Sequence, residues 1–270
     1  MYKKYLIVAS KQDLAGINIT TSLSQFDSEK FNFYLLEQDI LHEENLDIEK
    51  INSYDFIIFA SKHVSKERTK TLSIHAPGNI NEAKFGGKEK QLSPTSALFQ
   101  KQLFQNIDFF KEKFNLKNYK LTLESTHHGP LISKPCVFIE IGSTETEWKD
   151  RKASFVIAKA ISKTINSFKE NPYNEVAIGI GGNHYCDAFN KLQLKSNIAL
   201  SYIFPKYTFP LSAEIIKQSI EETDEEVELA VLDWKGLGDA ESKKEILKLL
   251  DSLYIQHEKV SEIKNRTEMN

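Results

Sequence analysis

Lys-Tyr-Leu-Ile-Val-Ala at residues 4–9 is a short apolar run that ends at Ser10, and residues 13–26 then place apolar side chains at helical spacing. Because the run is apolar at successive positions, both faces of the strand that it predicts are expected to be buried. A buried strand followed at once by a helix is typical of an α/β sheet covered by helices.

The same pattern recurs along the rest of the chain. Further strands are expected at residues 31–37, 55–60, 71–75, 120–125, 136–141, 175–180, 198–204 and 227–232. Helices are expected at residues 94–114, 146–169, 211–222 and 240–254. We therefore predict an α/β fold of three layers, with a mixed sheet between helices on both of its faces.

The domain organisation follows from what interrupts this pattern. No Pro- or Gly-rich linker divides the chain, so residues 1–254 are expected to form a single α/β catalytic domain. The polar stretch 61–92 is the candidate for a small projecting lobe. Residues 255–270 are charged and lack periodicity, so we expect a frayed C-terminal tail.

Composition excludes several classes of protein. With 270 residues, 40% of them hydrophobic, the chain can bury a full core and is not disordered. No apolar stretch is long enough to span a membrane, and the N-terminus enters a strand without a charged and then apolar leader, so we expect a cytoplasmic protein without a membrane partner. The two cysteines, Cys136 and Cys186, are expected to be buried thiols, and a monomer is the simplest expectation for this length.

The formal net charge is −3, which argues against a protein that coats nucleic acid through a general basic field, and we expect no DNA partner. A polyanion would therefore have to meet a local patch of cations. One candidate patch is Lys84, Lys88 and Lys90 near a Gly-Gly pair, and a second runs from Lys101 to Lys120, where a solvated helix face is the alternative.

Histidines concentrate at three places in the sequence. Five of the seven histidines follow strand-like runs and enter Gly, Pro or Asn turns: His63 with His75, then His127 with His128, and then His184. A single histidine at a strand end is often structural, but repetition at three strand ends favours one shared site. Neutral imidazole is the commonest metal ligand, and three such ligands leave a position for a water molecule that can attack an ester.

The adjacent pair His127-His128 constrains such a site. Neighbouring side chains point to opposite faces of an extended strand, so both imidazoles can serve one site only if the chain turns there. The following Gly129-Pro130 is compatible with a turn. Without a turn, one histidine would line the pocket. The other, with Glu124 or Thr126, would contact a metal ligand and orient it without binding the metal itself.

A fourth segment supplies carboxylates. Thr144 and Glu147 have the spacing of a capping box, so Glu147 is expected to cap a helix. Glu140 lies inside an apolar run, where a carboxylate is costly unless it is paired. Glu140 and Glu145 are therefore the candidates for a metal ligand or a general base.

Two Gly- and Asp-bearing loops complete the candidates. Gly179-Ile-Gly181-Gly182 lacks the spacing of a dinucleotide-binding loop, and we expect its amides to act as oxyanion-type donors beside His184 instead. Asp13 follows the first strand and either binds ligand or caps a helix. No Ser or Cys lies in an elbow motif, so covalent catalysis has little support.

Together these motifs resemble those of the archaeal and plant type of D-aminoacyl-tRNA deacylase, in the same order. The resemblance implies a phosphorylase/hydrolase-like fold, zinc dependence, and hydrolysis of the ester between a D-amino acid and tRNA. Lys62 stands where the family usually has Arg, which keeps the charge but loses bidentate geometry. The matching segments are Asp13–Ile19, Ser61–His63, Leu72–Asn79, Glu124–Pro130, Glu140–Trp148 and Gly179–Tyr185.

The roles expected from this resemblance are as follows. One or two zinc ions are held or oriented by His75, His127, His128 and His184. Zinc-activated water attacks the aminoacyl carbonyl, and protons are moved by Glu140, Glu145 or His128. The D-aminoacyl-tRNA substrate is bound by Asp13, Asn18, Lys62, His63, Gly181, Gly182 and Tyr185.

Two alternatives belong to other functional classes. The first is a metal-dependent amidohydrolase or peptidase, or a phosphorylase-like enzyme, that acts on a small substrate without RNA. The second is a tRNA-end binding module in which the histidines are structural.

Overall fold

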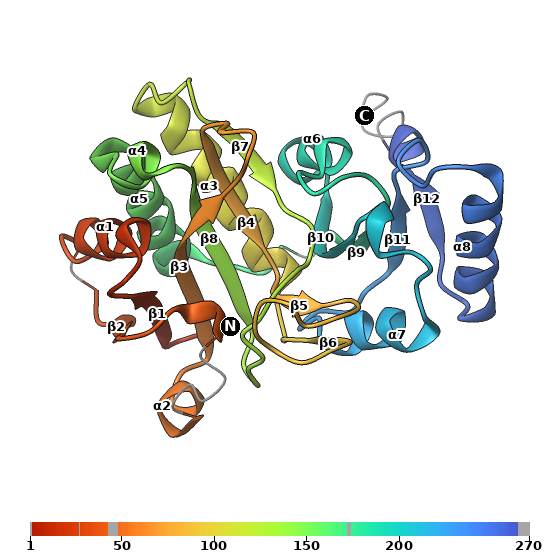
Figure 1. Cartoon of the computed structure of the whole chain (residues 1–270), viewed down its shortest axis with the longest axis horizontal. Helices are drawn as coiled ribbons and strands as arrows, with labels where there is room; N and C mark the ends of the chain where they lie inside the picture. Colours follow the sequence, from red (N-terminus) through yellow and green to blue (C-terminus); the bar gives the residue numbers. More distant parts are fainter. Residues whose placement is uncertain (1, 27, 43–47, 172–173, 264–270) are drawn as a thin grey trace.

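The structure is a computed structural model that describes residues 2–26, 28–42, 48–171 and 174–263. Most of its strands belong to two sheets. The first sheet has the order β2-β1-β3-β8-β4-β7 and the second the order β10-β9-β11-β12 (Figure 1). The strands of the first sheet are β1 (Tyr5–Ser10), β2 (Phe31–Leu36), β3 (Phe56–Val64), β4 (Thr71–His75), β7 (Lys120–Leu123) and β8 (Cys136–Ser143). The strands of the second are β9 (Glu175–Ile180), β10 (Ile198–Phe204), β11 (Leu229–Leu232) and β12 (His257–Lys259).

The helices lie around these sheets. The longer ones are α1 (Leu14–Leu23), α3 (Ala97–Lys113), α5 (Arg151–Ser167), α6 (Asp187–Lys195), α7 (Ala213–Glu221) and α8 (Ala240–Ser252). The shorter ones are η1 (Ile40–His42), α2 (Ile48–Asn52), α4 (Glu145–Trp148) and η2 (Lys206–Thr208). Within the described ranges, no helix combines the length and apolar character that crossing a bilayer requires.

The opening segment forms the strand and helix expected of it. Every residue of β1 is buried, and β1 pairs in parallel with β2 on one side and β3 on the other. Asp13 then caps α1 by accepting a hydrogen bond from the Gly16 N–H at 2.9 Å. The helix-capping interpretation of Asp13 is therefore confirmed.

The first sheet is mixed and has both faces covered. Strands β2, β1, β3 and β8 are parallel, whereas β4 is antiparallel to β8 and parallel to β7. One face packs against α1, α3 and α5, and the opposite face is covered by η1, α2 and residue Ile132. The mixed α/β class is confirmed.

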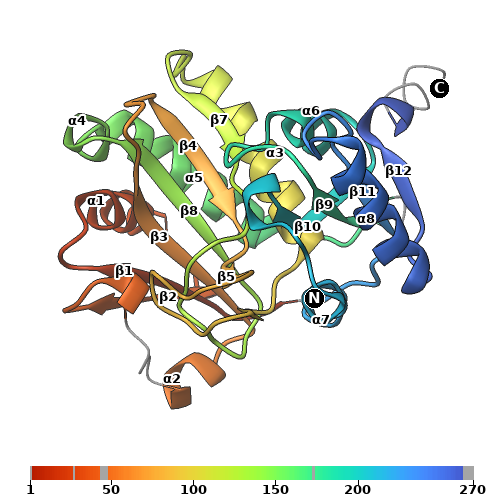
Figure 2. The ribbon, with the colours of Figure 1, turned by 45° about the vertical axis from the view of Figure 1, so that its right-hand side comes forward.

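The strands are nevertheless divided between two sheets where one was expected. The second sheet is all parallel and has α6 against one face and α7 and α8 against the other. Helix α3 packs against β4 of the first sheet and β10 of the second, and so joins the two (Figure 2). Both cysteines are buried thiols, as expected.

The expected bounds of the projecting lobe are wrong. Residues 61–64 end β3 and residues 71–75 form the buried strand β4, so both segments lie inside the first sheet, joined by the short connection 65–70. The segment that leaves the sheet is 76–92, a lobe that carries the two-stranded pairing of β5 (Gly78–Asn79) with β6 (Gln91–Leu92).

The C-terminal tail is also better ordered than expected. Strand β12 pairs in parallel with β11, and Val260 and Ile263 are buried in the core, so the chain is not frayed as far as residue 263. A short polar strand at a sheet edge has no apolar alternation, which explains why it was missed. Residues 264–270 of the predicted tail lie outside the described residues.

The predicted basic helix face is interrupted by Lys101, which is buried. Its Nζ donates hydrogen bonds of 2.8 Å to the carbonyls of Gln193 and Ser196 at the end of α6 and of Ile198 at the start of β10. Burial lowers the pKa of Lys101 to about 8. The cation therefore satisfies carbonyls that the helix end leaves unpaired, rather than forming part of an anion-binding surface.

Replacing Lys101 by methionine is expected to lower the free energy of unfolding by about 3 kcal/mol, because buried carbonyls lose their donor. Urea unfolding measures this. The exposed Lys113→Met on the same helix is the control and should change stability by less than about 0.5 kcal/mol. Equal stability of the two variants would contradict the assigned role of Lys101.

Candidate active site

The segment that follows β7 links the two sheets. The Glu124 N–H donates to the carbonyl of Ile74 in the first sheet at 3.0 Å. The next two amides, of Ser125 and Thr126, donate to the carbonyls of His184 and Ile203 beside the second sheet, both at 2.9 Å. The seam between the sheets therefore brings together the histidine-bearing loops that are far apart in sequence.

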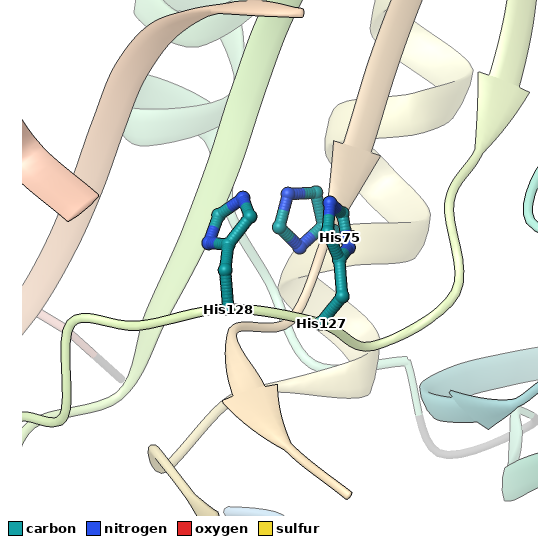
Figure 3. Close-up of side chains that lie close together, drawn as sticks. All are labelled: His75, His127 and His128. Carbon is teal, nitrogen blue, oxygen red and sulfur yellow. The ribbon is translucent and has the colours of Figure 1, made fainter. Parts of the chain in front are cut away.

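Three histidine rings meet at this seam (Figure 3). His75 ends β4, and its ring centroid lies 4.3 Å from that of His127 and 4.8 Å from that of His128. The His127 and His128 centroids are 4.2 Å apart. His128 has a φ of 48°, so the chain turns at His128 itself and the neighbouring imidazoles reach the same site.

Backbone carbonyls fix the tautomer of each of these three rings. The Nδ1 atom of His127 lies 2.7 Å from the Ser125 carbonyl, that of His128 lies 2.7 Å from the Gly129 carbonyl, and that of His75 lies 3.3 Å from the Ala76 carbonyl. Because a carbonyl only accepts, each Nδ1 carries the proton and each Nε2 keeps its lone pair.

These imidazoles are neutral at physiological pH. Burial, together with the nearby His128, lowers the pKa of His75 and of His127 well below the ordinary value. Burial also lowers the pKa of His128 to about 4. The Nε2 of His75 is buried and has no hydrogen-bond partner among the described residues.

Glu124 lies at the centre of a second group at the same seam. One carboxylate oxygen is 3.0 Å from Nδ1 of His63, and the other is 3.0 Å from Nε2 of His184 and 3.7 Å from Nε2 of His127. Burial acts to raise the pKa of Glu124, but the contacts with His184 and His63 hold it well below the ordinary value. Glu124 is therefore a buried carboxylate anion surrounded by imidazoles.

Glu140 joins this second group from β8. Its carboxylate lies 3.5 Å from Nδ1 of His63, and burial raises the pKa of Glu140 to about 7. Burial acts to lower the pKa of His63, but Glu124 and Glu140 raise it to about 11, so His63 carries a proton. The Tyr185 hydroxyl lies 3.1 Å from Nε2 of His63 and holds the ring from the other side.

A cavity of about 590 Å³ opens beside these groups. His127, His128 and His184 reach its wall, together with Thr126. The lobe and η2 supply the rest of its lining, which comprises Asn79, Ile80, Asn81, Glu82, Lys84, Phe85, Tyr207 and Thr208.

A family model described as D-aminoacyl-tRNA deacylase matches residues 50–258, which include both groups of side chains. The chain belongs to the D-aminoacyl-tRNA deacylase family. The family predicted from the motifs is therefore confirmed, and with it the class of enzyme, a hydrolase.

Known relatives of the D-aminoacyl-tRNA deacylase family agree with this match over most of their length. A protein of Methanocaldococcus jannaschii named D-aminoacyl-tRNA deacylase is 33% identical, over 95% of this chain and 100% of the relative. One of Archaeoglobus fulgidus with the same name is 36% identical, over 88% and 90%. A crystal structure of a conserved protein of unknown function, AF0625, has a TM-score of 0.88 at 31% identity and covers 97% of each chain.

Several residues predicted to form the deacylase site lie elsewhere or are already engaged. Glu145 is exposed on α4 and pairs with Lys149, so the structure does not support the proton-transfer role predicted for it. Asn18 donates to the Trp148 carbonyl at 2.8 Å, and the Asp13 carboxylate accepts from the Lys62 N–H at 2.8 Å. These side chains brace the loops around α1 and α4 and do not line the cavity.

The oxyanion role expected for Gly181 and Gly182 is wrong for their amides. The Gly181 N–H donates to the Phe204 carbonyl at 2.8 Å, and the Gly182 N–H donates to the Gly236 carbonyl at 3.1 Å. Both residues have positive φ values, so the glycines are needed to turn the chain toward His184.

Glu147 caps α4 through the Thr144 N–H at 3.1 Å, as its spacing predicts.

Glu124 has a larger place in the site than its sequence position predicts. The sequence predicts only that it orients a ligand, yet it contacts three histidines of the site. The signal was its position directly before Ser-Thr-His-His at the end of a strand-like run. A carboxylate at this position is costly to bury unless it is paired, which is the same reason that makes Glu140 a candidate.

The three-histidine group fits a zinc ion. Nitrogen atoms of His75, His127 and His128 all lie within 4.8 Å of one another, and zinc in catalytic sites commonly has three protein ligands. The buried Nε2 of His75 has no partner in the described part of the chain, which is otherwise costly, and ligation would satisfy it. A second group of this kind consists of His63, Glu124 and His184.

Gly129 allows the lobe to approach the histidine loop. A Cβ atom at Gly129 would lie 2.3 Å from the Gly87 nitrogen and 2.6 Å from the Gly86 carbonyl carbon, and backbone atoms cannot rotate away. Replacing Gly129 by alanine is therefore expected to lower the free energy of unfolding by about 1 to 3 kcal/mol, measured by urea unfolding. Wild-type stability in this variant would show that the lobe does not depend on the close contact.

Proposed function

We propose that the chain hydrolyses the ester that joins a D-amino acid to the 3′ end of tRNA, and that it does so at the seam between the sheets. The observation that carries this proposal is the meeting of the family's histidine motifs at one cavity. The names of the relatives from Methanocaldococcus jannaschii and Archaeoglobus fulgidus support the substrate. A cytoplasmic location is part of the same proposal, because charged tRNA is used there.

The metal is proposed to be zinc, in one or two ions. Nε2 of His75, His127 and His128 would hold the first. His63, Glu124 and His184 would suit a second only once His63 has given up the proton that it carries beside Glu124 and Glu140. Bound zinc supplies a water molecule that is acidic near neutral pH and a positive charge that polarises a carbonyl. His184, which was predicted with His75, His127 and His128 to hold or orient one or two zinc ions, is thereby assigned to the second.

The chain's own residues have distinct tasks in this proposal. Glu124 balances the charge of His63 and holds the His184 ring through Nε2, so the His184 side chain keeps one orientation at the cavity wall. Glu140 lies behind Glu124 and shares the proton of His63 with it. These buried carboxylates are the groups placed to accept and return a proton during ester hydrolysis.

The proposal is tested with a charged tRNA and a small ester of the same amino acid. Hydrolysis of D-tyrosyl-tRNA is expected to require metal, so dialysis against a chelator should abolish it and zinc should restore it. Substrate binding should also weaken steeply between about 50 and 200 mM salt, because phosphates are contacted. If D-tyrosine methyl ester were hydrolysed faster than the charged tRNA, without salt dependence, an enzyme for small substrates would replace the proposal.

A further inference from the structure

Two exposed aromatic rings stand at the mouth of the cavity. Phe85 is 59% exposed and Tyr207 is 61% exposed, whereas His128 at the wall is 8% exposed. We call Phe85 and Tyr207 the mouth aromatics. Large exposed rings at the edge of a concave site are typical of ligand recognition rather than of folding.

The mouth aromatics are tied to the segment that carries the histidines. The Phe85 carbonyl accepts from the Gly129 N–H at 3.0 Å, and the Tyr207 hydroxyl lies 2.9 Å from the Ser125 hydroxyl. Asn81 of the lobe donates to the Thr208 carbonyl at 3.0 Å, which links the two sides of the mouth. The backbone of Phe85 and the ring of Tyr207 are therefore placed before a ligand arrives, which reduces the entropy lost on binding.

We propose that the mouth aromatics bind the adenine base of the 3′-terminal adenosine of tRNA by stacking. This inference rests on the proposed function and names the part of the substrate that the cavity mouth recognises. Unpaired bases at RNA ends are commonly recognised by stacking on aromatic side chains. Lys84 also lines the cavity but pairs with Glu82 at 3.0 Å, so the two rings rather than a surplus of positive charge carry this inference.

The position of the rings favours the base over the amino-acid side chain. The ester carbonyl must approach the histidines, which are less exposed than the two rings. The nucleoside that carries the ester then lies further out, at the level of the mouth aromatics. The base is also the part of the substrate that does not vary between tRNAs, and a preformed aromatic surface suits a constant ligand.

The direct test uses an uncharged acceptor-stem RNA hairpin that ends in 2-aminopurine in place of the terminal adenine. Stacking quenches the fluorescence of this base, so binding to the wild-type protein should quench it. Phe85→Ala should remove most of the quenching and weaken binding roughly 5- to 100-fold, while Phe85→Trp should retain both. Phe109→Ala, which removes a ring that is 58% exposed on α3, is the matched control and should match wild type.

Two results would overturn the inference. One is unchanged quenching in Phe85→Ala and Tyr207→Ala. The other is equal wild-type affinity for a hairpin whose terminal nucleotide lacks a base. Because this assay needs no ester, loss of the stacking signal and absence of deacylase activity are separate results.

Kinetics distinguish the base from the amino-acid side chain. With D-tyrosyl-tRNA, Phe85→Ala is expected to raise KM by a larger factor than it lowers kcat. The factor by which KM rises should be the same for D-aspartyl-tRNA. A factor that changed with the amino acid would mean that the rings contact the side chain, and the assignment to adenine would fail. Thermal unfolding of Phe85→Ala checks that the variant is folded.

Discussion

Replacing His75 by glutamine is expected to lower kcat/KM for D-tyrosyl-tRNA by roughly 10³-fold, because the proposed zinc ion, which would stabilise the transition state by several kcal/mol, would lose a ligand. His75 is the sharpest choice among the three histidines. Its Nε2 is buried without a partner among the described residues, and the proposed ion would satisfy this atom. Glutamine has a similar volume and keeps the core filled.

The zinc content and the stability of the same variant give independent readouts. Metal that binds the folded state adds stability as RT ln(1 + [L]/Kd), so zinc should raise the melting temperature of the wild type and not that of His75→Gln. Without zinc the two proteins should unfold alike. His257→Gln in β12, outside the cluster, is the matched control and should behave as wild type. Full zinc content and full activity in His75→Gln would remove His75 from the metal site.

Replacing Glu124 by glutamine is expected to have the second large effect, a loss of roughly 10² to 10³ in kcat/KM. The substitution keeps the shape of the side chain but removes a buried negative charge that faces His63 and His184. His63 would then keep only Glu140 as a charged partner, and breaking a buried pair also destabilises a protein by about 3 to 5 kcal/mol. Activity and urea unfolding measure the two effects.

Glu145→Gln is the matched control for this substitution. Glu145 is exposed and pairs with Lys149, so the neutral variant is expected to keep both activity and stability. If Glu145→Gln were inactive and Glu124→Gln active, the carboxylate roles assigned from the structure would be reversed.

Local patterns were sufficient to predict the class of fold. The strands are apolar on both faces, as in the buried run 5–10, and the helices carry an apolar stripe along one face, as in α5. Both signals depend only on residues that are close together in the sequence. The division into two sheets depends on pairing between distant strands, such as β8 with β4, which no local signal encodes. Helix α6 was missed because Asp187–Lys195 is short and mostly polar.

The site was predicted in outline for a related reason. Histidines followed by turn residues mark loop ends, so all five histidines of the cluster could be named from the sequence. Their division into two groups could not be predicted, because it depends on the φ of His128 and on the seam that places His184 beside Glu124. The hydrogen bonds of the Gly181 and Gly182 amides could not be predicted, because their acceptors lie far along the chain, at Phe204 in β10 and at Gly236.

The most direct test of the account is the rate at which the zinc-loaded protein releases tyrosine from D-tyrosyl-tRNA compared with L-tyrosyl-tRNA. The account predicts release of the D-amino acid at least roughly 10²-fold faster than that of the L-form, as a site that excludes one side-chain direction would produce. Equal release of both forms, or release of neither, would contradict it.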